Sequence, residues 1–181
     1  MNAFRVRVSL LFALFAMAAA ARPALGQRTQ TGPFDPRSGR FGAALPIGPD
    51  RAPDTLAVTQ ARAWAVVGQL FSDLGIPVSV VDTSSHVLGA LRATQRRPVA
   101  GERLSRILEC GTGSFGPNAE RYTVQLTVLA SVQARDAGHA TVETRVGGVA
   151  APNGLSSSVT CASTGVLEDR ITAELRKVVG S

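Results

Sequence analysis

The sequence predicts an α+β fold, with a four- or five-stranded antiparallel sheet and two helices packed on one of its faces. Two segments carry apolar residues at helical spacing, and several others alternate apolar and polar residues as half-buried strands do. These segments follow the order (β)αββ–ββα, which packs most economically as two layers. The chain has 181 residues, 45% of them hydrophobic, so it can bury one core but is too short for two large domains.

The N-terminus has the features of a cleaved signal peptide, residues 1–26. Arg5 and Arg7 precede a nearly unbroken apolar run over 8–21, and Ala24-Leu25-Gly26 fits a small-residue cleavage site. An uncleaved anchor is the alternative, but a bilayer span needs about 20 apolar residues. There is no cysteine near this site for a lipid anchor. We therefore expect a periplasmic or secreted protein with no transmembrane segment after cleavage.

Residues 27–53 form a second region, rich in proline and glycine and without any apolar period. Such a segment buries too little surface to offset the entropy of ordering, which predicts a disordered tether. A docking segment that orders on a partner is the alternative. The folded domain is expected over 54–181.

The first half of the domain is predicted as a strand, a helix and a hairpin. Residues 55–58 form a short strand, and Thr59 caps a helix that ends before Gly75. Its apolar stripe consists of Ala63, Val67, Leu70 and Leu74, with Trp64 and Phe71 beside them. Residues 76–81 and 87–91 then form a hairpin around a turn at 82–86.

The second half is predicted as another hairpin and a final helix. Residues 122–132 alternate so that one face is apolar and the other carries Thr123, Gln125, Thr127, Ser131 and Gln133, which predicts a wet face. A turn at 136–138 leads into a strand over 140–149. The final helix has an apolar stripe of Leu167, Ile171, Leu175 and Val178, with acids in its first turn and bases in its last.

Cys110 and Cys161 are the two cysteines of the chain, 51 positions apart. In an exported protein such a pair predicts one structural disulfide. The spacing does not match the C-x-x-C pattern typical of redox-active pairs.

The charge arises almost entirely from arginine. The formal net charge is +6, but residues 27–181 carry 16 basic and 13 acidic side chains, a net charge of +3. Five arginines fall within 15 residues: Arg92, Arg96, Arg97, Arg103 and Arg106. This cluster is a candidate patch for phosphate or carboxylate groups, and a solvated arginine-rich loop is the alternative. No aromatic residues are interleaved to stack on bases, which argues against nucleic acid.

Catalytic and metal sites are not indicated. Asp82, Ser84, Ser85 and His86 are too close in one turn to form a triad, and Glu102, Glu109 and Glu120 are not placed across any cleft by the pattern. His86 and His139 fall in predicted turns without the further ligands that zinc requires. The G-x-G-x-x-G match at 111–116 lacks the strand and helix that its phosphate chemistry needs. The sequence therefore predicts a protein that is not an enzyme, with no cofactor and no metal.

One stretch carries a family resemblance. Ala63-Trp64, the segment Leu74-Gly75-Ile76-Pro77-Val78, and Asp82 with the hairpin at Gly89 resemble the helix-grip domain of outer-membrane assembly lipoproteins of the BamC (NlpB) type. That resemblance implies a helix leading into a hairpin and a later helix returning to the sheet. This chain lacks the lipidated cysteine of that family, so no functional residue is carried over. The chain is also similar to short exported proteins of high-GC bacteria, which implies no activity.

These observations favour a non-catalytic exported envelope protein that acts as an interaction or accessory module. Its partner would be an envelope protein or an anionic envelope component, contacted through the open sheet face or the arginine cluster. The alternative is a small-molecule or lipid carrier with a pocket between helices and sheet. The sequence leaves the oligomeric state open.

Overall fold

The computed structural model describes residues 34–35, 40–41, 51–153 and 157–180. The chain divides into two compact units, 1–30 and 31–181, and every described residue belongs to the second. The expectations for the signal peptide and for most of 27–53 lie outside the described residues. Within that range, β1 (Phe34–Asp35) pairs antiparallel with β2 (Arg40–Phe41).

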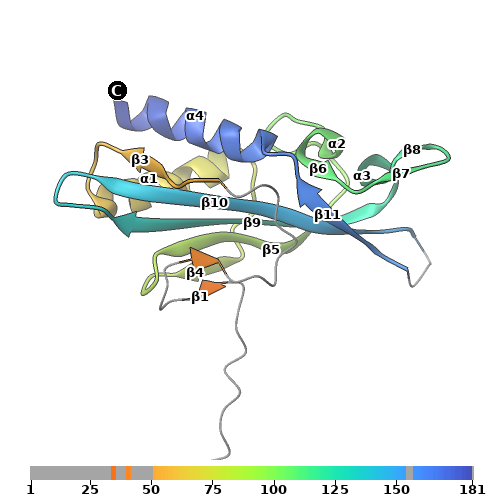
Figure 1. Cartoon of the computed structure of the whole chain (residues 1–181), viewed down its shortest axis with the longest axis horizontal. Helices are drawn as coiled ribbons and strands as arrows, with labels where there is room; N and C mark the ends of the chain where they lie inside the picture. Colours follow the sequence, from red (N-terminus) through yellow and green to blue (C-terminus); the bar gives the residue numbers. More distant parts are fainter. Residues whose placement is uncertain (1–33, 36–39, 42–50, 154–156, 181) are drawn as a thin grey trace, which may run out of the picture. The chain divides into compact units, whose positions relative to one another are not determined.

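The predicted α+β class with its antiparallel sheet is confirmed (Figure 1). The main sheet has seven strands where four or five were expected, and its order is β4-β5-β9-β10-β11-β6, with β3 also paired to β10. The additional strands are too short for an alternating pattern to identify them. The strands are β3 (Asp54–Leu56), β4 (Val80–Asp82), β5 (Val87–Gln95), β6 (Leu108–Glu109), β9 (Thr123–Ala134), β10 (Ala140–Ala151) and β11 (Val159–Ser163).

The β9–β10 hairpin forms the centre of the sheet. Its register runs without interruption from Ala140↔Ala134 to Ala151↔Thr123. From 124 to 132 the even-numbered apolar residues of β9 lie fully buried on one face: Val124, Leu126, Val128, Ala130 and Val132. The sequence predicted this apolar face correctly, because a period of two places alternate side chains on one side of a strand.

Both long helices pack on that apolar face. α1 (Gln60–Asp73) begins at the predicted cap, where the Thr59 hydroxyl accepts a hydrogen bond from the Arg62 backbone N–H. α4 (Val166–Gly180) contacts α1 and β10. Phe71 of α1 and Ile171 of α4 are fully buried in one core with the β9 residues. The two helices on one face are therefore as the sequence predicted.

The opposite face of β9 differs from the prediction. Thr127 and Ser131 were expected on a wet face, yet they are 3% and 1% exposed, and Leu129 between them is 1% exposed. Cross-strand neighbours flank this part of β9 on both sides, with Val87 opposite Ser131 on β5 and Arg145 opposite Leu129 on β10. The centre of this face is therefore too little exposed to be a candidate contact surface.

The domain's first strand is tied to its last helix. The Asp54 carboxylate of β3 accepts a hydrogen bond from the Thr172 hydroxyl at 2.6 Å and pairs with Arg176 at 2.8 Å. β3 itself pairs with Ala140–Val142, beside the part of β10 that pairs with β11. β10 thus shares its outer edge between two strands from opposite ends of the domain.

A buried carboxyl stands at the start of α4. Glu168 is 5% exposed, and its Oε2 accepts a hydrogen bond from the Ser163 hydroxyl at 2.8 Å. The Ser163 oxygen in turn accepts from the Gly165 backbone N–H. Burial raises the pKa of Glu168 above its ordinary value of 4.5, and the Ser163 hydrogen bond opposes that rise only in part.

Replacing this carboxyl is expected to change how stability depends on pH. A carboxyl whose pKa is raised by folding binds its proton more tightly when folded, so its contribution is most favourable below pH 4.5 and is lost as pH rises through the raised pKa. We expect Glu168→Gln, which keeps the oxygen acceptor for Ser163, to gain stability relative to the wild type as pH rises from 4.5 to 7. Urea unfolding at several pH values measures this. A difference that does not vary with pH would contradict it, and Glu174→Gln, a half-buried position on the same helix with an oppositely shifted pKa, is the control.

Candidate interaction surface

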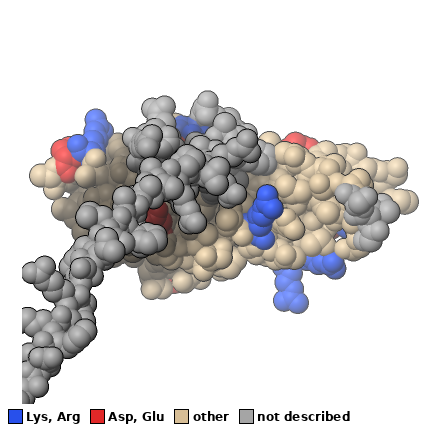
Figure 2. Space-filling view, turned by 90° about the horizontal axis from the view of Figure 1, so that it is seen from below, with Lys and Arg blue, Asp and Glu red and all other residues tan. Residues whose placement is uncertain are grey.

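The five arginines of the predicted patch extend from within β5, through the loop that follows it, into a short helix, α2 (Leu104–Ile107). All five are exposed: Arg92, Arg96, Arg97, Arg103 and Arg106. Residues 92–106 are called the basic segment below. Figure 2 views the molecule from below, the side on which β4 and β5 lie in Figure 1, and shows basic side chains standing out from a mostly uncharged surface.

Arg92 marks a β-bulge. The register between β5 and β9 shifts between Ala90 and Ala93, and Arg92 has a φ of +52°. The Arg92 backbone N–H donates to the buried Thr127 hydroxyl at 3.1 Å, which satisfies the donor that the bulge removes from the ladder. The bulge at Arg92 is therefore stabilised by this hydrogen bond, and β5 continues past the bulge to Gln95.

Arg96 is fixed by a small polar network. Its Nε donates to the Thr123 hydroxyl at 3.0 Å, and its Nη2 donates to Asn153 Oδ1 at 2.8 Å. The Thr123 hydroxyl also donates to Asn153 Oδ1. Arg96 is thereby held at the end of the sheet, where β9 begins and β10 has just ended.

The remaining arginines differ in how they are paired. Arg106 forms an ion pair with Glu102 at 3.4 Å, four residues earlier. Arg92, Arg97 and Arg103 form no ion pair with any acidic residue in the part of the chain that the structure describes. These three arginines are exposed and positively charged.

The acids near the basic segment are engaged in holding local structure. Glu120 Oε1 accepts from the Ser105 backbone N–H at 2.9 Å, and this hydrogen bond is the main cause of a lowered pKa at Glu120. Glu109 Oε1 accepts from the Gly111 backbone N–H. Between residues 92 and 121 six arginines face three glutamates, so this end of the domain is net positive.

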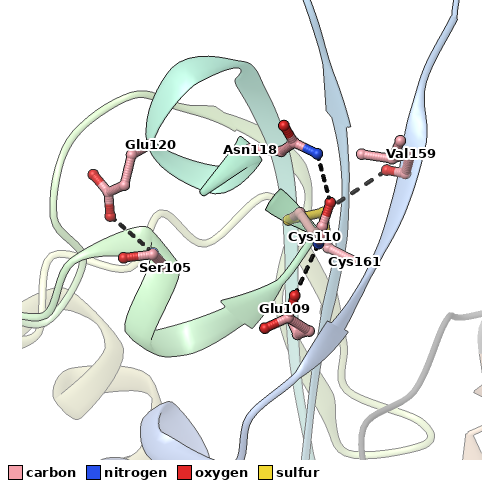
Figure 3. Close-up of a disulfide and its surroundings, with 8 residues drawn as sticks. Ser105, Glu109, Cys110, Asn118, Glu120, Val159 and Cys161 are labelled. Atoms are coloured by element: carbon pink, nitrogen blue, oxygen red, sulfur yellow. Dashed lines mark hydrogen bonds between the residues drawn. A yellow bond between two sulfur atoms is a disulfide. The ribbon is translucent and has the colours of Figure 1, made fainter. Parts of the chain in front are cut away.

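The Cys110–Cys161 disulfide is present, as the sequence predicted. It joins the end of β6 to β11 beside α3 (Asn118–Arg121), and Figure 3 shows Asn118 directed at the Cys110 carbonyl. That amide donates to the carbonyl oxygen at 3.0 Å. The Glu120–Ser105 contact in the same view brings α3 against α2, so the disulfide, α2 and α3 form one anchored cluster.

A small hairpin projects from this cluster. β7 (Thr112–Gly113) pairs with β8 (Gly116–Pro117), and Ser114 and Phe115 form its tip. It is called the Phe115 hairpin below. The Phe115 side chain is 82% exposed, and the Arg121 guanidinium carbon lies 5.7 Å from its ring centroid.

Beside the hairpin the surface is hollowed by about 480 Å³. The hollow is lined by the hairpin together with Asn118, Arg121, Tyr122, Pro152 and Asn153. Since Asn153 also accepts the hydrogen bond from Arg96, the hollow adjoins the basic segment. The sequence reasoning missed Phe115, Arg121 and Tyr122. A lone phenylalanine within a glycine-rich stretch is the signal that could have identified the hairpin tip.

The other residues considered from the sequence have local structural contacts. Asp82 Oδ1 accepts from the Ser84 hydroxyl at 2.6 Å and from the Ser84 and Ser85 N–H groups, and the Ser84 hydroxyl is the main cause of its lowered pKa. His86 packs edge-on against Trp64, at 5.4 Å between ring centroids. These contacts turn the chain between β4 and β5.

His139 lies at the other end of the central hairpin. Its Nδ1 lies 2.7 Å from Asp136 Oδ1 in the β9–β10 turn, and this contact lowers the pKa of Asp136. Within the described ranges, no three His, Cys, Asp or Glu side chains are grouped so as to hold a metal ion. Gly111–Gly116 contains the small hairpin where a phosphate-binding loop would need a strand leading into a helix.

No protein-family model, curated protein or solved structure matches this chain. The resemblance to the BamC type stays a prediction drawn from the residues of the first helix and hairpin. Function is therefore argued below from the surface itself.

Proposed function

We propose that this chain is a non-catalytic exported envelope protein that binds an anionic macromolecular partner through the basic segment. The observation that carries the proposal is the set of exposed arginines, Arg92, Arg97 and Arg103, that form no ion pair with any described acid. Such guanidinium groups bind phosphate and carboxylate in a bidentate manner and steer an anionic partner to the surface.

One further observation supports an exported protein. The disulfide fits an oxidising compartment. No helix in the described ranges is long and apolar enough to cross a membrane.

The packing between the helices and the sheet favours binding at the surface over a carrier role. Fully buried side chains from both layers fill it, including Phe71, Leu126 and Ile171. A carrier would have a pocket behind Trp64. That side chain is partly buried and packs against the core. The hollow beside the Phe115 hairpin lies elsewhere and is lined by surface residues.

Charge reversal tests the proposal. We expect Arg92→Glu combined with Arg97→Glu to reduce capture of the partner roughly tenfold or more, because both attraction and steering are reversed in sign. The measurement is crosslinking of the tagged chain in intact cells, followed by quantification of what is attached. The matched control is Arg62→Glu combined with Arg170→Glu, the same change of charge on the exposed sides of α1 and α4.

The control decides between a local patch and net charge. If both double variants lose capture equally, the loss reflects the total charge of the chain and not a local patch. If Arg92→Glu with Arg97→Glu leaves capture unchanged, the basic segment does not bind the partner. A partner whose capture resists higher salt would also contradict the proposal, since exposed ionic contacts are screened by salt.

A further inference from the structure

We propose that the Phe115 hairpin inserts its aromatic tip into a lipid surface that bears anionic headgroups, with Arg121 binding the phosphate groups beside it. This inference rests on the proposed function, because it names the anionic partner of the basic end as a membrane surface.

The first argument is the exposure of Phe115. At 82% it is the most exposed large apolar side chain among the described residues, above Val81 at 60%. Moving a phenylalanine ring out of water into an apolar phase is favourable. The fold itself does not use that free energy, so it is available to an apolar phase that reaches the hairpin.

The second argument is that the base of the Phe115 hairpin is anchored to the rest of the domain. The disulfide fixes Cys110 at the hairpin's root, and the Asn118 backbone N–H donates to the Gly111 carbonyl at 3.0 Å. The Asn118 side chain also donates to the Cys110 carbonyl, as Figure 3 shows. A tip presented on an anchored loop loses less entropy when it binds than a tip on a free loop.

The third argument is the chemistry around the tip. Arg121 lies against the Phe115 ring, and the hollow beside them also contains Tyr122, an aromatic residue with a polar end. Aromatic rings next to arginines are typical of surfaces that sit at the boundary between headgroups and acyl chains. Arg96 adjoins the same hollow through Asn153, which adds positive charge where the headgroups would lie.

The shape favours lipid over a protein partner. Phe115 stands out at the tip of a two-stranded loop, where a protein partner would have to supply a matching pocket. A lipid surface accepts a projecting ring without any preformed pocket, and anionic headgroups complement the six arginines between residues 92 and 121.

Vesicle binding tests this inference. The chain, purified in the form that cells accumulate, is sedimented with vesicles of phosphatidylglycerol and phosphatidylethanolamine, and separately with vesicles of phosphatidylcholine alone. We expect binding to the anionic vesicles and a roughly tenfold loss with Phe115→Ser, in keeping with the free energy of burying the ring. The control is Val81→Ser, which removes an exposed apolar side chain from β4 and leaves binding unchanged.

A second variant reports insertion directly. We expect the fluorescence of Phe115→Trp to be quenched by brominated acyl chains in anionic vesicles, beyond any quenching of the native Trp64 in the wild type. Equal quenching in the two proteins would overturn insertion of the tip, even if both proteins sediment with the vesicles.

The outcomes separate this inference from the proposed function. If the arginine reversals abolish vesicle binding while Phe115→Ser does not change it, the hairpin inference fails and the proposed function stands. If the chain binds no vesicles but captures a protein in an arginine-dependent manner, the partner is a protein and the inference fails. If neither vesicle binding nor partner capture depends on the arginines, the proposed function itself fails.

Discussion

Replacing Gly89 by alanine is expected to destabilise the domain by about 3 kcal/mol or more, among the largest effects of any single substitution in this chain. A Cβ built on Gly89 would lie 2.0 Å from the Val128 carbonyl oxygen and 3.0 Å from the Leu129 Cα. Both are backbone atoms of the central strand β9, so the clash cannot be relieved by a change of rotamer. The φ of Gly89, +152°, is also one that residues with a side chain rarely adopt.

The control for this effect is Gly68→Ala. Gly68 lies within α1, and its added Cβ would stand 3.8 Å from Leu88 Cδ2, an ordinary van der Waals distance. Since glycine costs roughly 0.5–1 kcal/mol in a helix relative to alanine, this variant should equal or exceed the wild type in stability. Urea unfolding of both variants measures the difference. A Gly89→Ala protein as stable as the Gly68→Ala protein would show that β5 and β9 can separate at no cost.

Removing the disulfide is the second large effect. Cys110 and Cys161 close a loop of 51 residues, for which loop entropy predicts a loss of about 4 kcal/mol. Both residues are buried, so alanine at both positions avoids placing new polar groups in the core. We expect the double variant to unfold at a lower urea concentration than the wild type.

Reduction provides the internal control for that measurement. Under a thiol reductant the wild type should approach the stability of Cys110→Ala combined with Cys161→Ala, and the variant should not change. Equal stability of the oxidised wild type and the variant would show that the disulfide contributes nothing. Because the disulfide anchors the root of the Phe115 hairpin, the variant should also present its tip less rigidly.

The sequence was most informative where a regular pattern runs over many residues. α1 follows from its apolar stripe and from the Thr59 cap, and the β9–β10 hairpin from an alternation that Leu129 interrupts in β9 and that continues in the first residues of β10. The disulfide follows from there being two cysteines in a chain with export features. Each of these is determined by residues close together in the sequence or by counting.

The candidate site depends on contacts that no local pattern encodes. Phe115, Arg121 and Asn153 come from a hairpin, a short helix and the end of β10, and the disulfide with the sheet register brings them together. The arginine cluster could be predicted from the sequence. Which of its side chains form ion pairs or hydrogen bonds could not. The Arg96 side chain is hydrogen-bonded to Thr123 and Asn153, and Arg106 pairs with Glu102, whereas the side chains of Arg92, Arg97 and Arg103 form no ion pair within the described residues. The low exposure of Thr127 and Ser131 is likewise not encoded in the alternation of β9 itself.

The position of β3 has a consequence for the order in which the domain can be completed during synthesis. β3 is the first strand of the domain to be made, yet it pairs with Ala140–Val142, and Asp54 contacts Thr172 and Arg176 near the end of the chain. A chain that emerges N-terminus first therefore carries β3 without its sheet partner until β10 has followed. α1 waits in the same way for β9 and α4. The domain closes only when nearly all of it has emerged, and a chaperone that holds the early segments would act throughout that interval.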